Sequence, residues 1–281
     1  MSKRNGNGRN PSPISERTAV EIDVASSIEA PLERLDRMRR SLLFAEISML
    51  SYLPDAEATP VFQRLGFADV RYIERDGAQA YALGNADDLV IVCRGTEPNE
   101  WNDIKADANA WTDLSETVGR VHRGFKREVD DIWPILEGLL ESEERAIWFA
   151  GHSLGGAMAT ICAGRCEYSD KIAKPMKEVY TYGSPRVGTK RYIQHAKVTH
   201  VRWVHNNDIV TRVPPRWLGY RHTGTRMYLD RKGNVKNFSA AQRAKDRAAG
   251  FREGLKQRKF DHFSDHAIAD YVRHIRSSVE D

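Results

Sequence analysis

The spacing of hydrophobic positions changes several times along the chain, and each spacing predicts a different element. Apolar residues three and four positions apart predict helices over 31–53 and 121–140, while short apolar or alternating runs predict strands. The expected strands cover residues 68–73, 79–83, 89–93, 146–150, 179–182, 198–204 and 225–229. Further helices are expected over 157–163, after Gly188, and over 239–258 and 266–277. Strands that alternate with helices predict an α/β fold with a mostly parallel central sheet and helices on both faces.

The start of the chain lacks this periodicity. Residues 1–30 are rich in serine, asparagine, glycine and charge, which predicts a flexible N-terminal tail before a single domain over 31–281. We recognise neither a run of roughly 18 apolar residues that could span a membrane nor the apolar core of a signal peptide. Three cysteines, Cys93, Cys162 and Cys166, lie in apolar runs and are expected to be buried and reduced. We therefore expect a cytoplasmic protein.

The net charge of +4 conceals a local excess of basic residues. Residues 231–260 contain ten Lys and Arg but two Asp and Glu, so this segment alone carries +8. Because the excess is local, it predicts a surface feature and argues against a nucleic acid partner. Apolar residues recur there at helical spacing, so they are expected to pack while the basic residues stay in solvent. The apolar set is Ala241, Ala244, Ala248, Phe251 and Leu255, and the basic set is Arg243, Arg247, Arg252, Lys256 and Lys259.

Two interpretations of this basic helix stay open. It is either a docked helix with an ordinary charged exterior, or a surface in 239–259 that contacts anionic membrane headgroups.

A Gly-x-Ser-x-Gly sequence, residues 151–155, supplies the first candidate for chemistry. It follows an apolar run and opens a helical run, which is the strand–turn–helix context of a nucleophile elbow. Such a turn exposes the serine hydroxyl at the start of the helix, so Ser153 is the candidate nucleophile. The backbone N–H of Leu154 is then positioned to stabilise an oxyanion.

A serine nucleophile needs a base, and the base needs a carboxylate that orients it. The best acid is Asp208, which follows the apolar run 198–204 and precedes a stiff Val213-Pro214-Pro215 segment. Asp230, after the run 225–229, is the alternative. Asp208 could instead only form a turn.

The best base is His266, because it lies at the start of the last predicted helix. The buried positions expected in that helix are Ala267, Ile268, Tyr271, Val272 and Ile275. His262 is the main competitor for the role of base. Together with Asp261 and Asp265 these histidines resemble a metal site, but no further ligand is evident, so we expect neither a metal nor a cofactor.

A second oxyanion donor should follow an earlier strand. Residues 89–93 form such a strand and lead into Arg94-Gly95-Thr96, so Thr96 is the candidate. Beyond it, Trp101, Trp111 and Leu114 are candidates for an acyl-binding surface, with core packing as the alternative.

Six ordered fragments together resemble the class 3 lipases, the fungal-type triacylglycerol lipase family. They are residues 93–96 with Trp101, 121–125, 151–156, 181–188, 207–210 with Pro214, and 265–266 with Tyr271. The resemblance implies an α/β-hydrolase fold with Ser153 as nucleophile, Asp208 as acid and His266 as base. It also implies an oxyanion hole formed by Thr96 and Leu154.

These residues predict a lipase or esterase that cleaves lipid esters through an acyl-enzyme. A phospholipase A or thioesterase with the same residues is an alternative. A second alternative is a hydrolase-like scaffold that binds lipid or protein without turnover. The sequence does not indicate an oligomeric state.

Overall fold

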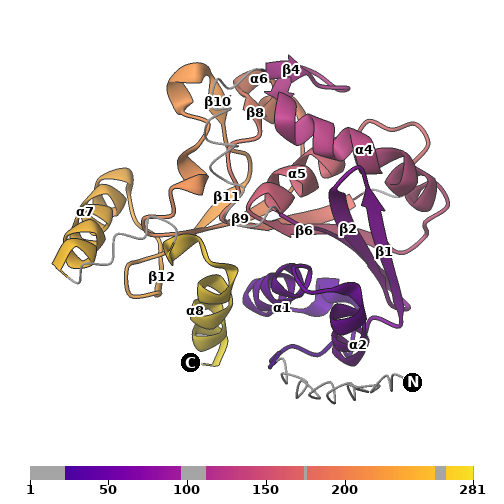
Figure 1. Ribbon diagram of the computed structural model, residues 1–281, viewed down its shortest axis with the longest axis horizontal. Helices are drawn as coiled ribbons and strands as arrows, with labels where there is room; N and C mark the ends of the chain where they lie inside the picture. The colour runs from indigo at the N-terminus through magenta and orange to yellow at the C-terminus, as the bar shows by residue number, and fades with distance from the viewer. Residues whose placement is uncertain (1–22, 96–111, 174–175, 257–263, 281) are drawn as a thin grey trace, which may run out of the picture.

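One large sheet organises the described part of the chain. The computed structural model describes residues 23–95, 112–173, 176–256 and 264–280. Within them, eight strands pair in the order β1-β2-β3-β6-β7-β9-β11-β12 (Figure 1). They are β1 (Asp69–Arg75), β2 (Ala78–Gly84), β3 (Asp88–Cys93), β6 (Ala146–His152), β7 (Met176–Tyr182), β9 (His200–His205), β11 (Thr225–Leu229) and β12 (Val235–Lys236).

The centre of this sheet is parallel and its edges are antiparallel. β3, β6, β7, β9 and β11 run parallel, whereas β1, β2 and β12 pair antiparallel with their neighbours. The carboxyl ends of the parallel strands therefore meet at one edge, where ligand sites of α/β sheets lie. The expected α/β class with a mostly parallel sheet is confirmed.

Helices cover both faces of this sheet (Figure 1). One face packs against α1 (Arg37–Leu50), α2 (Asp55–Leu65) and α8 (Ile268–Glu280), and the other against α4 (Arg123–Leu140) and α5 (Leu154–Cys166). Each face has its own buried apolar cluster, and the three cysteines are buried and unpaired, as expected. None of the described helices combines the length and apolar character that a bilayer crossing requires.

Several elements differ from the sequence-based expectation. α2 was not predicted, and a second sheet joins short strands in the order β10-β8-β5-β4. Its strands are β4 (Thr112–Leu114), β5 (Arg120–His122), β8 (Gly188–Thr189) and β10 (Tyr220–Arg221). The helix expected after Gly188 is confirmed as α6 (Lys190–His195). Strands of two or three residues are too short to carry a periodic signal.

The helices also begin and pack differently in detail. The helix expected from residue 31 begins at Arg37, because the Asp36 carboxylate accepts hydrogen bonds from the Met38 and Arg39 backbone N–H groups. In α4 the buried stripe continues through Leu136 and Leu140, whereas Ile135 is 36% exposed. A period of 3.6 residues that starts from Phe125 and Val129 favours Leu136 and Leu140 as the buried positions.

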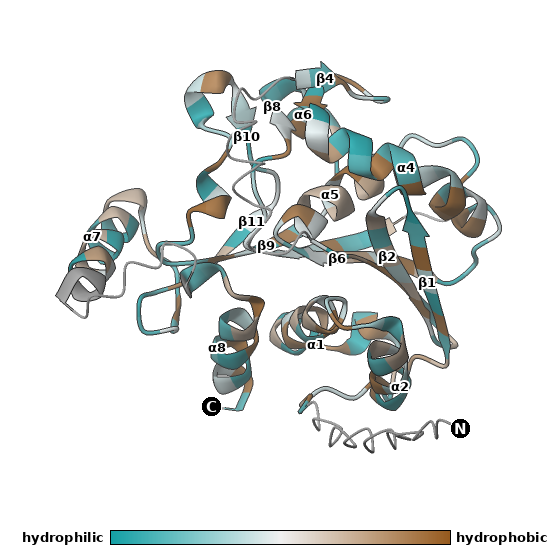
Figure 2. Cartoon of the chain, viewed as in Figure 1, coloured by the Kyte–Doolittle hydropathy of each residue, from teal (hydrophilic) through white to brown (hydrophobic). Residues whose placement is uncertain are grey.

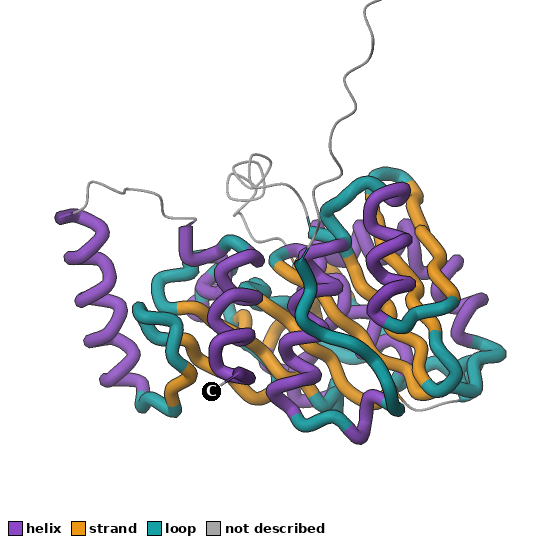
Figure 3. Tube along the Cα trace, turned by 90° about the horizontal axis from the view of Figure 1, so that it is seen from below, coloured by secondary structure: helices purple, strands orange, loops and turns teal. Residues whose placement is uncertain are grey.

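The orientation expected for the basic helix, α7 (Ala240–Lys256), is wrong. Ala241, Ala244 and Ala248 are exposed and Phe251 is 52% exposed, whereas Arg243 and Arg247 face the sheet. Alanines bury little area, and polar contacts fix the opposite side. α7 lies at one end of the molecule (Figure 3). Its residues are partly hydrophilic and partly hydrophobic (Figure 2).

Those polar contacts come from the inward side of α7. The Asp246 carboxylate accepts a hydrogen bond from the Tyr228 hydroxyl at 2.9 Å and pairs with Arg231 at 3.7 Å. The Asn207 side chain donates to the Arg247 carbonyl at 3.2 Å. Leu255, Lys256 and Lys259 were part of the same expectation, but their side chains lie outside the described residues.

The described residues before α1 lie against the domain, although the sequence assigned them to the tail. Glu46 in α1 is fully buried, and its carboxylate accepts hydrogen bonds from the backbone N–H groups of Ala25 and Ser26 at 2.8 and 3.1 Å. The same carboxylate pairs with Arg276 of α8 at 3.0 Å. One buried acid therefore joins residues 25–26, α1 and α8.

We expect Glu46→Ala to lower the free energy of unfolding by about 1–3 kcal/mol, because it removes a buried charged acceptor that Ala25, Ser26 and Arg276 share. Chemical denaturation followed by circular dichroism should show a lower midpoint at an unchanged slope. Glu144→Ala, at an exposed glutamate, is the matched control and should leave the midpoint unchanged. Equal midpoints for the two variants would contradict this role of Glu46.

Candidate active site

Ser153 lies in the sharp turn between β6 and α5. Its backbone has φ 60° and ψ −128°, a conformation that residues other than glycine rarely adopt. The turn also needs Gly155, because a Cβ there would collide with the backbone of Cys93 and Arg94 at the end of β3. The Gly-x-Ser-x-Gly sequence thus folds into the strand–turn–helix that its neighbours predict.

The structure brings Ser153, His266 and Asp208 together in one chain of hydrogen bonds. His266 Nε2 lies 2.8 Å from Ser153 Oγ, and its Nδ1 lies 3.1 and 3.0 Å from the two Asp208 carboxylate oxygens. A carboxylate only accepts, so Nδ1 carries a proton and, in neutral imidazole, Nε2 accepts from the serine hydroxyl. All three side chains are at least 97% buried.

Asp208 is fixed from two further directions. It follows β9, and its Oδ1 accepts a hydrogen bond from the Val210 backbone N–H at 2.9 Å. The Tyr271 hydroxyl of α8 donates to Oδ2 at 2.6 Å and accepts from the His205 N–H at 3.0 Å. Burial, and then the Asp208 charge, raise the pKa of Tyr271 well above its usual value, so the hydroxyl stays a donor.

Gly183 leaves room for this contact. Its φ is +59°, and a Cβ at this position would lie 2.8 Å from both Asp208 Oδ2 and His266 Nδ1. A side chain at residue 183 would therefore force the acid and the base apart. In the sequence Gly183 is only one residue of the 181–188 fragment, because spacing along the chain does not reveal its contact with Asp208 and His266.

His152 is a site residue that the sequence analysis missed. Its Nε2 donates to the His266 carbonyl at 2.7 Å, and its Nδ1 accepts from the Tyr52 hydroxyl at 2.9 Å. Burial, and then the proximity of His266, lower the pKa of His152 well below its usual value. A neutral His152 thus connects the serine turn to the backbone of the histidine.

The candidate oxyanion hole is described only in part. Leu154 is the first residue of α5, so its backbone N–H is among those without an acceptor inside the helix. Thr96, Trp101 and Trp111 lie outside the described residues. Leu114 is 64% exposed, which excludes core packing for this member of the expected acyl-binding surface.

The competing acid, Asp230, has another role. The Asp230 carboxylate accepts from the Lys232 and Asn234 N–H groups and closes the turn between β11 and β12. His262 lies outside the described residues. In the described ranges, no group of three or more His, Cys, Asp and Glu side chains could hold a metal ion.

The arrangement has the parts that acyl transfer requires. The histidine can remove the serine proton as the hydroxyl attacks a carbonyl carbon, while the aspartate stabilises the imidazolium. Together with the central parallel sheet, this arrangement corresponds to the α/β-hydrolase fold.

Comparison with known proteins shows which family the central part of the chain resembles. Residues 90–217 match the class 3 lipase family model, a range that contains Ser153 and Asp208 but not His266. Lipase II from Rhizopus niveus has a similar fold, with a TM-score of 0.57 and 22% identity over 69% of this chain and 80% of that chain. The expected resemblance to the class 3 lipases is confirmed, and the match to the family model covers residues 90–217.

Two relatives illustrate the extent of this similarity. Secreted mono- and diacylglycerol lipase 1 of Fusarium solani is 35% identical over 118 residues, which are 39% of this chain and 34% of the relative. Toxin TseL of Vibrio cholerae is 34% identical over 100 residues, which are 35% of this chain and 15% of the toxin. The chain thus matches 34% of the length of the first relative and 15% of the second.

Proposed function

We propose that this protein hydrolyses carboxylic esters of glycerolipids through an acyl-enzyme on Ser153. The observation that carries the proposal is the hydrogen-bonded chain from Ser153 through His266 to Asp208 at a strained strand–turn–helix. The Fusarium relative is named a mono- and diacylglycerol lipase, which supports glycerol esters of fatty acids as the substrate class.

In this mechanism His266 takes the Ser153 proton as Oγ attacks the ester carbonyl. The Leu154 N–H, together with Thr96, stabilises the oxyanion of the tetrahedral intermediate. His266 then returns the proton to the departing alcohol. Water, activated by the same histidine, attacks the acyl-enzyme, and the fatty acid leaves.

The alternatives share these residues and differ in substrate. A phospholipase A would cleave glycerophospholipids and a thioesterase would cleave acyl thioesters, whereas a non-catalytic scaffold would cleave none. We place the enzyme in the cytoplasm within this proposal because its cysteines are buried and unpaired, although the Fusarium relative is named as secreted.

Contact of residues 239–259 with an anionic membrane also belongs to the proposal, but through the outward side of α7. That side exposes Lys245, Phe251 and Arg252. Phe251→Ser should reduce co-sedimentation with anionic vesicles, and equal co-sedimentation of both proteins would remove this contact from the proposal.

Ser153→Ala should abolish release of fatty acid from mono- and diacylglycerols while the protein stays folded. Loss of a serine nucleophile typically lowers turnover by about 10⁴-fold or more. The same assay on a glycerophospholipid and an acyl thioester ranks the alternatives. A Ser153→Ala variant that retains substantial activity would exclude Ser153 as the nucleophile. If the unmodified protein cleaves none of these substrates, the remaining interpretation is a scaffold that binds lipid or protein without turnover.

His266→Ala should reduce turnover of a short p-nitrophenyl ester as strongly as the serine substitution, because the base lies 2.8 Å from Oγ. His262→Ala is the matched control and should retain most activity. A loss that is equal in the two variants, or larger for His262→Ala, would overturn the choice of base.

A further inference from the structure

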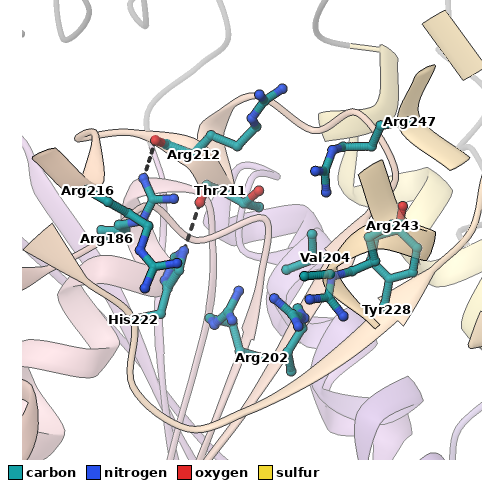
Figure 4. A pocket seen from close by; sticks show the side chains of 12 residues that line it. Arg186, Arg202, Val204, Thr211, Arg212, Arg216, His222, Tyr228, Arg243 and Arg247 are labelled. Carbon is teal, nitrogen blue, oxygen red and sulfur yellow. Dashed lines mark hydrogen bonds between the residues drawn. The ribbon is translucent and has the colours of Figure 1, made fainter. Parts of the chain in front are cut away.

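A cleft lined by arginines lies at the β9 and β11 side of the main sheet, between the 210–218 segment and α7 (Figure 4). It encloses about 240 Å³, and seven of its twelve lining residues are arginines. No aspartate or glutamate is among these described lining residues, and none of Ser153, Asp208 and His266 contributes to it. We call this feature the arginine cleft.

The strand register places two of these arginines side by side. In β9, Val201 and Trp203 pack into the cluster beneath α1 and α8, so Arg202 points to the opposite face. In the parallel pairing of β9 with β11, Arg226 is the partner of Arg202. Like charges at paired positions destabilise a sheet. The pairing of Arg202 with Arg226 therefore lowers the stability of the sheet unless an anion lies between the two guanidinium groups.

Other elements add charge to the same space. Figure 4 shows Arg186 and Arg216 at one end of the arginine cleft, Arg243 and Arg247 at the other, and Arg202 between them. Arg243 and Arg247 are one helical turn apart on the inward side of α7. Like charges at this spacing also destabilise a helix.

Arg202 lacks the partners that a buried cation requires. It is 5% exposed, and its Nε has no hydrogen-bond partner. The other buried arginine of the described residues, Arg165 at 7% exposure, pairs with Asp130 and Glu116. A buried charge without compensation is strongly destabilising, so the unpaired Arg202 points to a ligand that supplies the negative charge.

The arginine cleft stays positively charged at neutral pH. Burial, and then the neighbouring arginines, lower the pKa of Arg202 to about 9 and that of Arg186 to about 10. Both values leave the guanidinium groups protonated. His222 adds no charge, because burial, and then Arg202, hold its pKa well below the usual value.

We propose that the arginine cleft binds a compact anion with two or more phosphate groups. A planar guanidinium group can donate two hydrogen bonds to two oxygens of one phosphate. The combined positive charge of several guanidinium groups is larger than one carboxylate can neutralise, which favours a ligand with more than one phosphate. The volume equals that of about eight water molecules, which suits a small phosphorylated headgroup. A lipid headgroup and a free phosphate ester share this chemistry.

Two binding experiments, both with the full chain, distinguish a lipid headgroup from a free phosphate ester. Calorimetry with myo-inositol 1,4,5-trisphosphate tests the free ester, and inorganic phosphate is the single-phosphate reference. Co-sedimentation with phosphatidylcholine vesicles, with and without phosphatidylinositol 4,5-bisphosphate, tests the headgroup. Binding of the free trisphosphate supports a soluble ligand, and binding only to vesicles that contain the bisphosphate supports a lipid.

Paired variants tie the binding to this place. Arg243→Gln with Arg247→Gln should weaken binding by about tenfold or more, since charge-assisted hydrogen bonds are lost. Arg123→Gln with Arg127→Gln removes the same charge, at the same spacing, from the exposed side of α4 and should leave the affinity within about twofold. Arg202→Met should also weaken binding. If this variant of a buried residue does not fold, the Arg243/Arg247 pair on α7 still tests the proposal, because those two residues lie at the edge of the cleft.

Three results would overturn the proposal. The first is no binding in either experiment, and the second is trisphosphate binding no tighter than inorganic phosphate. The third is equal loss in the Arg243/Arg247 pair of α7 and the Arg123/Arg127 pair of α4, which would indicate general surface charge. A single-stranded oligonucleotide could also bind more tightly than the trisphosphate and lose this binding when Arg243 and Arg247 are changed to Gln. That result would identify the ligand as a nucleic acid and not a compact anion.

Discussion

The hydrogen bonds between Asp208 and His266 hold together segments that lie 58 residues apart and belong to different layers of the fold. Asp208 follows a central strand, whereas His266 precedes the helix that packs beneath the sheet. The contact requires the Tyr271 hydroxyl on the carboxylate and the absence of a side chain at Gly183. Without this contact Ser153, the proposed nucleophile, would lack an oriented base, and the strained turn that directs its hydroxyl toward His266 would have no chemical use.

The sequence predicted much of this framework because its signals are local. The strand–turn–helix at Ser153 is encoded within about fifteen residues, and the parallel strands are apolar runs of ordinary length. Asp208 and His266 were selected by their positions after a strand and before a helix. The structure places these two beside Ser153, while Asp230 closes a turn instead.

What the sequence could not predict depends on contacts between distant residues. The role of His152 requires that the His266 carbonyl lie 2.7 Å from its ring, which no spacing encodes. In α7 the periodic alanines suggested the wrong inward side, because weak apolar burial is outweighed by the hydrogen bond between Tyr228 and Asp246. The same reversal turned Arg243 and Arg247 from presumed surface charges into the wall of the arginine cleft.

The central claim is that Ser153 becomes acylated during turnover. Rapid acid quenching after mixing with a p-nitrophenyl acyl ester, followed by peptide mass spectrometry, measures this directly. The account predicts one acyl group on the peptide that contains Ser153, at a level that rises before steady state and is absent from Ser153→Ala. An acyl group on another residue, or hydrolysis without any acylated peptide, would contradict the account.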